Sequence, residues 1–92
     1  MSIYTEYMKE LCKFSAQIDS AKVTDNGFVE LQKLNDKILE GEHKKYYTHE
    51  QRRQLGNIAL YLIDQYRETL RLNERVKQIE KEITRQRRKT VA

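Results

Sequence analysis

The chain is poor in residues that interrupt or cross-link a polypeptide. It has no proline, three glycines and a single cysteine among its 92 residues. One cysteine cannot form an intrachain disulfide, which is consistent with a reducing compartment. Few breaking residues favour long helices over many short strands. The composition therefore predicts an all-α protein.

Long apolar runs are also missing. No stretch approaches the roughly 18–20 apolar residues that a bilayer-spanning helix needs, and residues 1–20 are too polar for a secretory signal. We therefore expect a cytoplasmic protein without a membrane partner. The length and the 38% apolar content suit one small helical domain covering residues 1–92.

Positive charge is concentrated in the second half of the chain. Residues 43–92 hold 13 Lys/Arg and 6 Asp/Glu, whereas residues 1–42 hold 5 and 8. Charged residues make up 35% of the chain, against about 25% in an average globular domain, so much of the surface should be solvated helix. An acidic first half joined to a basic second half is typical of a binding protein with two electrostatically distinct surfaces.

Two short helices are predicted in the first half. The first, at about 3–20, carries one apolar stripe at helical spacing, formed by Tyr4, Tyr7, Met8, Leu11, Cys12, Ser15 and Ile18. Thr24 or Asp25 can cap the second helix, at about 26–40, and Gly41 should end it in a left-handed conformation. The apolar positions of this second helix are Phe28, Leu31, Leu34 and Ile38.

A long third helix is predicted at about 49–86. Thr48 and Gln51 form a capping-box pattern at its start, and no strong breaker follows. Most positions of one heptad seam are apolar, with a positions at Leu55, Leu62, Thr69, Val76 and Ile83, and d positions at Ile58, Gln65, Leu72 and Ile79. The first part of the seam is widened, as a helix with two neighbours requires, by Ala59, Ile63, Tyr66 and Leu70.

These lengths predict two short N-terminal helices packed on the first half of one long C-terminal helix. At about 1.5 Å per residue the short helices reach only about 27 and 23 Å, against about 57 Å for the long one. The residues expected to be among the most buried are Leu11, Ile18, Phe28, Leu31, Leu34, Ile58, Leu62 and Tyr66.

The last turns of the long helix then lack cover from their own chain. Four aliphatic residues there form a predicted protein interface, because leaving each exposed forfeits about 1.5–3 kcal/mol; they are Leu72, Val76, Ile79 and Ile83. Either a second copy of the chain, in a homodimer, or another protein would cover them. Gln65 and Thr69 weaken a self-made coiled coil, which slightly favours another protein.

Two groups of basic residues are candidate sites for nucleic acid or an acidic partner. One follows the long helix into a basic tail at 84–92 and comprises Arg75, Lys77, Lys81, Arg85, Arg87, Arg88 and Lys89. The other lies in and after the connection between the second and third helices, residues 42–47. It comprises Lys44, Lys45, Arg52 and Arg53, with Tyr46 and Tyr47 between them. Arginine pairs phosphate through two parallel N–H bonds, and tyrosine stacks on bases. The alternatives are a solubilising tail and tyrosines that fold inward to seal the core.

No catalytic, metal or cofactor site is predicted. His43 and His49 have no further ligand at a usual spacing, and the adjacent His49 and Glu50 point in different directions on a helix. Cys12 lies on the apolar stripe and is expected to be a small buried hydrophobe. A helix-turn-helix is disfavoured because the second connection is too long for its tight turn.

The leading hypothesis is a small non-enzymatic binding protein that occupies a protein or nucleoprotein surface through its long basic C-terminal helix. A phage-type inhibitor of a host nucleic-acid machine, of the anti-CRISPR kind, has this profile. The alternatives are a homodimeric DNA- or RNA-binding regulator and a structural adaptor subunit. A small enzyme is the least favoured class.

Overall fold

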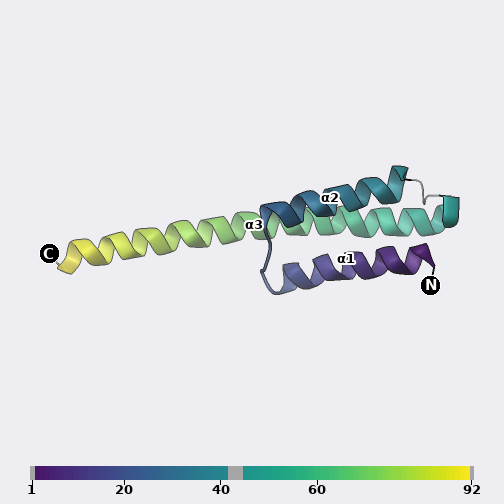
Figure 1. Cartoon of the computed structure of the whole chain (residues 1–92). Coiled ribbons are helices and arrows are strands. Elements are labelled where there is room, and N and C mark those ends of the chain that lie inside the picture. The colour runs from purple at the N-terminus through teal and green to yellow at the C-terminus, as the bar shows by residue number, and fades with distance from the viewer. Residues whose placement is uncertain (1, 42–44, 92) are drawn as a thin grey trace.

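Three helices make up the part of the chain that the computed structural model describes, which is residues 2–41 and 45–91, without the side chains of 88–91. Helix α1 spans Ile3–Asp19, α2 spans Asp25–Glu40 and α3 spans His49–Val91. No strand occurs within these described ranges. In Figure 1, α1 and α3 run in the same direction, α2 runs in the opposite direction, and α3 lies between α1 and α2 in this view.

Side-chain caps begin all three helices. The Ser2 hydroxyl accepts a hydrogen bond from the Thr5 N–H at 3.2 Å, and the Thr24 hydroxyl accepts one from the Gly27 N–H at 2.9 Å. At α3 the predicted capping box is confirmed: the Gln51 N–H donates to the Thr48 hydroxyl at 3.1 Å, and the Thr48 N–H donates to the Gln51 side chain at 3.0 Å. Each cap satisfies backbone donors that the first turn of a helix leaves without partners.

The ends of the short helices differ from the prediction. Gly41 is extended, with φ −74° and ψ 169°, so the expected left-handed conformation is wrong. A Cβ at this position would lie 2.3 Å from the Lys37 carbonyl oxygen, and this close approach is why a glycine is needed. The left-handed residue is Ala21, with φ 57°, where the Lys22 N–H reaches back to the Gln17 carbonyl in a Schellman-type ending of α1.

The core lies where α1 and α2 pack on the first half of α3. Its buried residues are Tyr7, Leu11, Leu31, Leu34, Ile38, Tyr47, Leu55, Ala59, Leu62, Ile63 and Tyr66. Ile18, Phe28 and Ile58 pack only at its edge and are partly buried, so the prediction that they are among the most buried residues is wrong. Cys12 is exposed, because the helical turn carries it away from the buried Leu11 next to it.

The long helix extends well past its two neighbours. Its 43 residues correspond to about 65 Å, close to the 67 Å length of the whole molecule. The α1–α2 connection is tied to α3 by a 3.0 Å hydrogen bond from the Asn73 side chain to the Ala21 carbonyl. We call α1, α2 and α3 up to Asn73 the head, and residues 74–91 the projecting segment (Figure 1). The helix ends at Val91 rather than near residue 86 as predicted.

Candidate binding surfaces of the projecting helix

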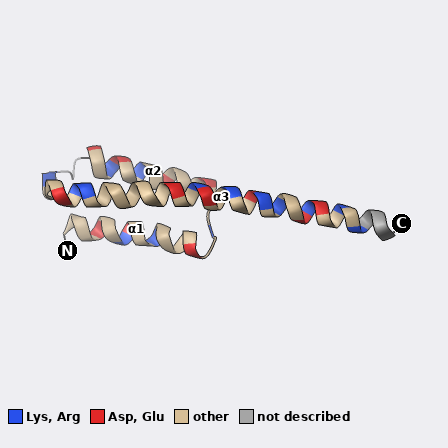
Figure 2. Cartoon of the chain, turned by 180° about the vertical axis from the view of Figure 1, so that it is seen from behind, with Lys and Arg blue, Asp and Glu red and all other residues tan. Residues whose placement is uncertain are grey.

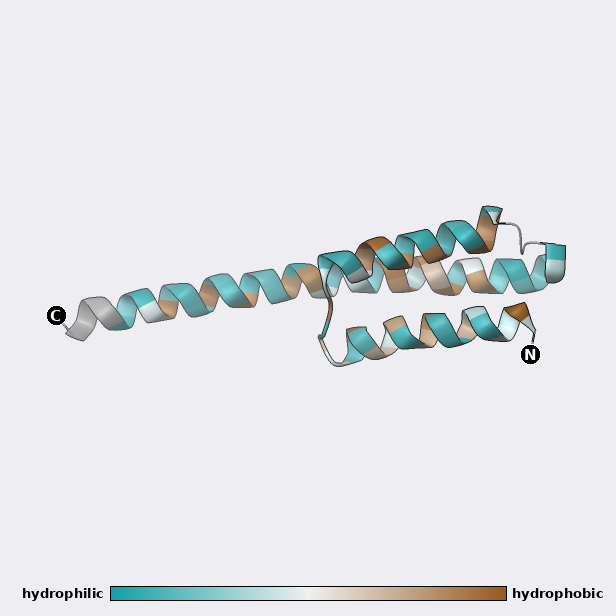
Figure 3. Cartoon of the chain, in the orientation of Figure 1, coloured by the Kyte–Doolittle hydropathy of each residue, from teal (hydrophilic) through white to brown (hydrophobic). Residues whose placement is uncertain are grey.

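The projecting segment has no cover from the rest of the chain. Every side chain from Glu74 to Arg87 is exposed. Four aliphatic side chains, three in this segment and one just before it, point to solvent with about half of their surface accessible: Leu72 50%, Val76 52%, Ile79 52% and Ile83 46%. From here on we use the word seam for these four residues. Figure 3 shows hydrophobic residues recurring along this otherwise hydrophilic segment. Their spacing of three and four residues places them on one side of the helix.

The seam does not continue the face of α3 that packs in the head. The buried face of α3 consists of Leu55, Ala59, Leu62, Ile63 and Tyr66. At about 100° per residue, the centre of the seam lies about 110° around the helix from the centre of that face. The predicted a/d seam is therefore wrong as one continuous packing face: its d position at Gln65 is exposed. The head and the seam use two different sides of α3.

A stripe of positive charge lies on the side of the projecting segment opposite the seam. We call Lys77, Lys81 and Arg85 the basic stripe; all three are exposed and border one shallow depression with Glu80 and Thr84. The stripe is centred about 170° around the helix from the seam. Figure 2 shows the basic residues that recur along this part of α3. Like charges four residues apart on a helix repel one another by about 0.2–0.5 kcal/mol per pair.

Glu74 lies on the same side as the stripe, one turn before Lys77, and the other charged residues with described side chains lie beside the seam. Arg75 and Glu82 lie on one flank of the seam, and Glu80 and Arg87 lie on the other. Each flank therefore carries one charge of each sign. The sequence prediction grouped Arg75 and Arg87 with the stripe because it counted charge along the chain and not around the helix. The side chains of Arg88 and Lys89 lie outside the described residues.

The second predicted basic group contains one exposed tyrosine and one buried tyrosine. Tyr46 is 62% exposed, with the Lys45 ammonium over its ring at 5.2 Å from the centroid, so the alternative that both tyrosines fold inward is wrong for Tyr46. Arg53 is exposed and Arg52 is half-buried. Lys44, like His43, lies outside the described residues.

Tyr47 is a core residue and takes the inward position. It is 8% exposed, its ring meets that of Tyr7 edge-on at 6.4 Å, and its hydroxyl donates to the Ile38 carbonyl. Burial raises the pKa of the Tyr47 hydroxyl, and the charge of the nearby Arg52 opposes part of this rise. This tyrosine therefore fixes the start of α3 against α1 and α2 and is not available to stack on a base.

The two basic groups do not form one surface. Arg53 and Arg75 are 22 residues apart on the same straight helix, which corresponds to about 33 Å. Lys45 precedes the start of α3 by four residues, and that start lies at the end of the head farthest from the projecting segment (Figure 1). A single partner would have to span most of the molecule to contact both groups. The projecting segment is the better candidate because its basic residues are aligned on one face.

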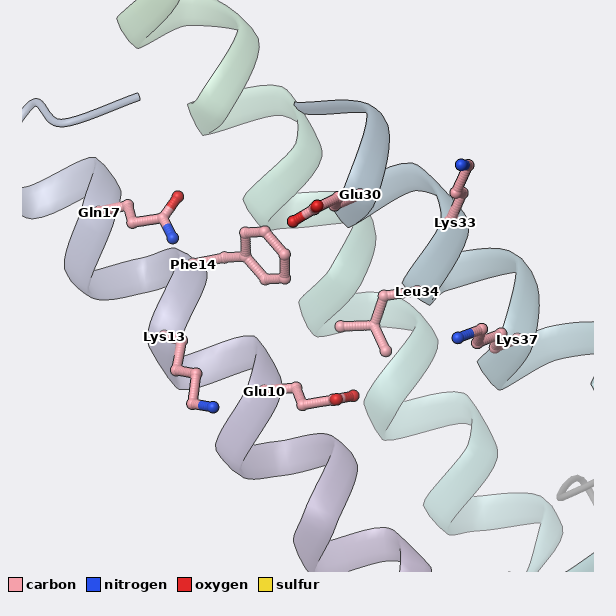
Figure 4. Close-up of a pocket in the computed structure, with 8 residues that line it drawn as sticks. All are labelled: Glu10, Lys13, Phe14, Gln17, Glu30, Lys33, Leu34 and Lys37. Atoms are coloured by element: carbon pink, nitrogen blue, oxygen red, sulfur yellow. The ribbon is translucent and has the colours of Figure 1, made fainter. Parts of the chain in front are cut away.

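A shallow groove separates α1 and α2 on the side away from α3. Phe14 and Leu34 point into it, as Figure 4 shows, and charged side chains surround them. These charged residues are Glu10, Lys13, Glu30, Lys33 and Lys37. Carboxylates and ammonium groups alternate around the groove, so it has no pronounced charge of one sign.

Known proteins and common cofactor geometries give no further identification. Within residues 2–41 and 45–91, no three His, Cys, Asp or Glu residues are grouped so that they could hold a metal ion. None of the helices, as far as the structure describes them, combines the length and apolarity needed to cross a membrane. The chain matches no protein-family model, no curated protein and no solved structure.

Proposed function

We propose that this chain is a non-enzymatic helical binding protein that occupies an anionic surface of a protein or nucleoprotein complex with its projecting segment. The observation that carries the proposal is the basic stripe. Its three exposed cations lie on one face of the projecting segment, which α1 and α2 do not cover. Holding like charges four residues apart opposes helix formation. An anionic surface along the stripe would turn this repulsion into attraction.

Occupation of a surface is a sufficient mode of action for such a protein. A rod of about 27 Å, the length of 18 helical residues, can cover a binding site on a nucleic-acid-processing machine while the head remains outside. The chain would then act as a phage-type inhibitor of the anti-CRISPR kind, or as an adaptor subunit. A cytoplasmic location belongs to this proposal, because that is where such machines work.

Direct binding of nucleic acid is the second candidate function. The same stripe supports it, because lysine and arginine side chains displace counterions from a phosphate backbone and give a strongly salt-dependent affinity. The homodimeric DNA- or RNA-binding regulator belongs to this class. The two candidates differ in whether binding survives the removal of nucleic acid.

The experiment is a capture assay on the full chain and two variants with the same net charge. The stripe variant carries Lys77→Gln, Lys81→Gln and Arg85→Gln. The matched control replaces three exposed lysines of the head, Lys13, Lys22 and Lys33, by glutamine. Each protein is immobilised in a lysate of its host, with and without nuclease.

We expect the stripe variant to lose its partner and the head control to retain it. Partners that survive nuclease treatment support the proposed function, and loss of every partner to nuclease supports direct nucleic-acid binding. Titration of a mixed-sequence duplex should then give a salt slope lower by about two to three for the stripe variant. Equal capture by the stripe variant and the unaltered chain would contradict both candidates.

A further inference from the structure

The charges beside the seam are complementary to those of a second copy of the same chain. In a parallel two-stranded coiled coil, a residue at position g faces the residue at position e of the next heptad in the partner helix. With Val76 and Ile83 at a positions, Arg75 and Glu82 occupy g, and Glu80 and Arg87 occupy e. Arg75 then faces Glu80 of the second copy, and Glu82 faces Arg87. All four flanking charges find an opposite charge.

On the side of the head next to the seam, Glu68 is the charged residue that flanks the line of the seam, and the stretch before it is uncharged. Toward the head, the line of the seam continues over Gln65, Tyr61, Ile58 and Gln54, and Tyr61 is 63% exposed. Residues 54–63 contain no charged side chain, and Figure 2 shows this uncharged stretch of α3. A second α3 lying along the seam therefore meets no ionised group that it would have to desolvate over this distance.

Helix α1 adds to the same side. The Tyr4 hydroxyl donates to the Gln54 side chain at 3.0 Å, so α1 lies next to this line. The edge of α1 that faces away from α2 carries small or uncharged residues up to its last turn, namely Thr5, Met8, Cys12, Ser15 and Ala16, and ends at the charged Asp19. Every side chain from Glu74 to Arg87 is exposed, so neither helix occupies the place of a second α3 along the projecting segment.

We propose that the seam is the contact for a second copy of this chain, in a parallel homodimer held by Leu72, Val76, Ile79 and Ile83. β-Branched Val76 and Ile83 at a positions, with Leu72 at d, are typical of parallel dimers, whereas Ile79 at the other d position is more usual in higher oligomers. In the antiparallel alternative, position g faces g, which pairs Arg75 with Glu82 and leaves Arg87 unused. An anionic partner gains little at the seam, because the two arginines beside it, Arg75 and Arg87, are balanced by Glu80 and Glu82. The basic stripe stays on the outside of the dimer.

This inference does not rest on the proposed function, because the seam and the stripe are on opposite sides of the helix. Stripe variants test the function without changing the dimer, and seam variants test the dimer. Exchanging the two charges of one pair, Arg75 and Glu80, also distinguishes a parallel dimer from an antiparallel one.

The test is sedimentation equilibrium of the full chain and of charge-reversed variants. Arg75→Glu and Glu80→Arg should each raise the dissociation constant of the dimer about tenfold or more, because each creates two like-charge contacts. An equimolar mixture of the two should form heterodimers with the affinity of the unaltered chain. The double variant Arg75→Glu/Glu80→Arg should also recover it in a parallel dimer, whereas in an antiparallel dimer the carboxylate at position 75 would repel Glu82.

Val76→Asp is the strong seam variant and should raise the dissociation constant about 100-fold or more. Gln78→Asp, which adds the same charge on the outward side, is its matched control and should leave the dimer unchanged. Circular dichroism of each variant verifies that the head is still folded. A chain that stays monomeric at about 1 mM would overturn the proposal. So would a dimer that is insensitive to Val76→Asp, or a double variant that fails to recover.

Discussion

Replacing Gly27 by alanine should destabilise the head, although alanine is the better helix former. Gly27 is buried in the first turn of α2, and a Cβ added there would lie 2.0 Å from the Tyr66 hydroxyl oxygen. Tyr66 cannot easily move, because its ring is fully buried and contacts the ring of Phe28 at 6.0 Å. Its hydroxyl donates to the Gln17 side chain at 3.2 Å and accepts from the Thr24 N–H at 3.0 Å. This hydroxyl therefore joins all three helices.

The magnitude follows from opposing contributions. Alanine in place of glycine favours the helix by about 1 kcal/mol. Forcing an extra methyl group into a well-packed core costs about 1–3 kcal/mol, and displacing the hydroxyl weakens two hydrogen bonds worth about 1 kcal/mol each. We expect Gly27→Ala to lower the free energy of unfolding by about 2 kcal/mol.

A double-mutant cycle isolates the cause. Tyr66→Phe removes the atom that a Cβ at Gly27 would meet, and it should cost about 1–2 kcal/mol by itself, because the Thr24 N–H loses its partner. Once the hydroxyl is gone, the nearest neighbours of the added methyl group are the ring carbon Cζ of residue 66 at 3.0 Å and Thr24 Oγ1 at 3.1 Å, so the severe clash is relieved and a tight contact remains. The double variant should be more stable than the sum of the single effects predicts by about 1–2 kcal/mol.

The assay is urea unfolding followed by far-ultraviolet circular dichroism. Asn26→Ala, at an exposed position in the same turn, is the control and should change stability by less than about 0.5 kcal/mol. The reasoning would be refuted if Gly27→Ala stabilised the protein. Additive single effects would refute it equally, because the two positions would then not interact.

Two further predictions concern the start of α3 and its end. Burial raises the pKa of Tyr47 above the ordinary value of 10.0, so its hydroxyl ionises at a lower pH in the unfolded chain than in the folded one. The stability that this hydroxyl adds should therefore be lost as the pH rises from about 10 through the folded-state pKa. Tyr47→Phe should lower the free energy of unfolding by about 1 kcal/mol at neutral pH and should remove this loss of stability at high pH. The check is urea unfolding of both proteins across the pH range, and an equal pH dependence of stability in the two would contradict the prediction. Ending the chain after Glu74 should leave the urea midpoint of the head nearly unchanged at a concentration where the chain is monomeric, since residues 75–87 are all exposed, and a large fall would mean that the projecting segment supports the head.

Local signals in the sequence were enough for the three helices and their starts. Thr48 and Gln51 bond as their spacing predicts, because a capping box depends on residues three apart and on nothing distant. The ends were harder. The left-handed residue is Ala21 rather than Gly41, because the course of the chain after each helix depends on where it packs.

Side-chain burial was only partly predictable. Leu11, Leu31 and Leu62 lie in the core as expected, since helical spacing identifies an apolar face. Cys12, predicted to lie inside, is exposed, and so is Tyr46, for which an inward position was the alternative to a binding role. A repeat of apolar residues gives the direction of a face, but its width depends on how closely the neighbouring helices approach.

The sequence by itself determined that the chain forms two short helices and one long helix, and that the long one has four aliphatic residues beyond the reach of its neighbours. Local hydrogen bonding, apolar periodicity and the fixed rise per residue are sufficient for both conclusions. Only the tertiary structure decided which side of α3 the head uses. Because α1 and α2 pack about 110° away from the seam, the seam is open along its flank, and its charges are separated from the basic stripe. The choice of that side depends on packing between distant residues, such as Tyr66 with Gln17 and Thr24, which no local pattern encodes.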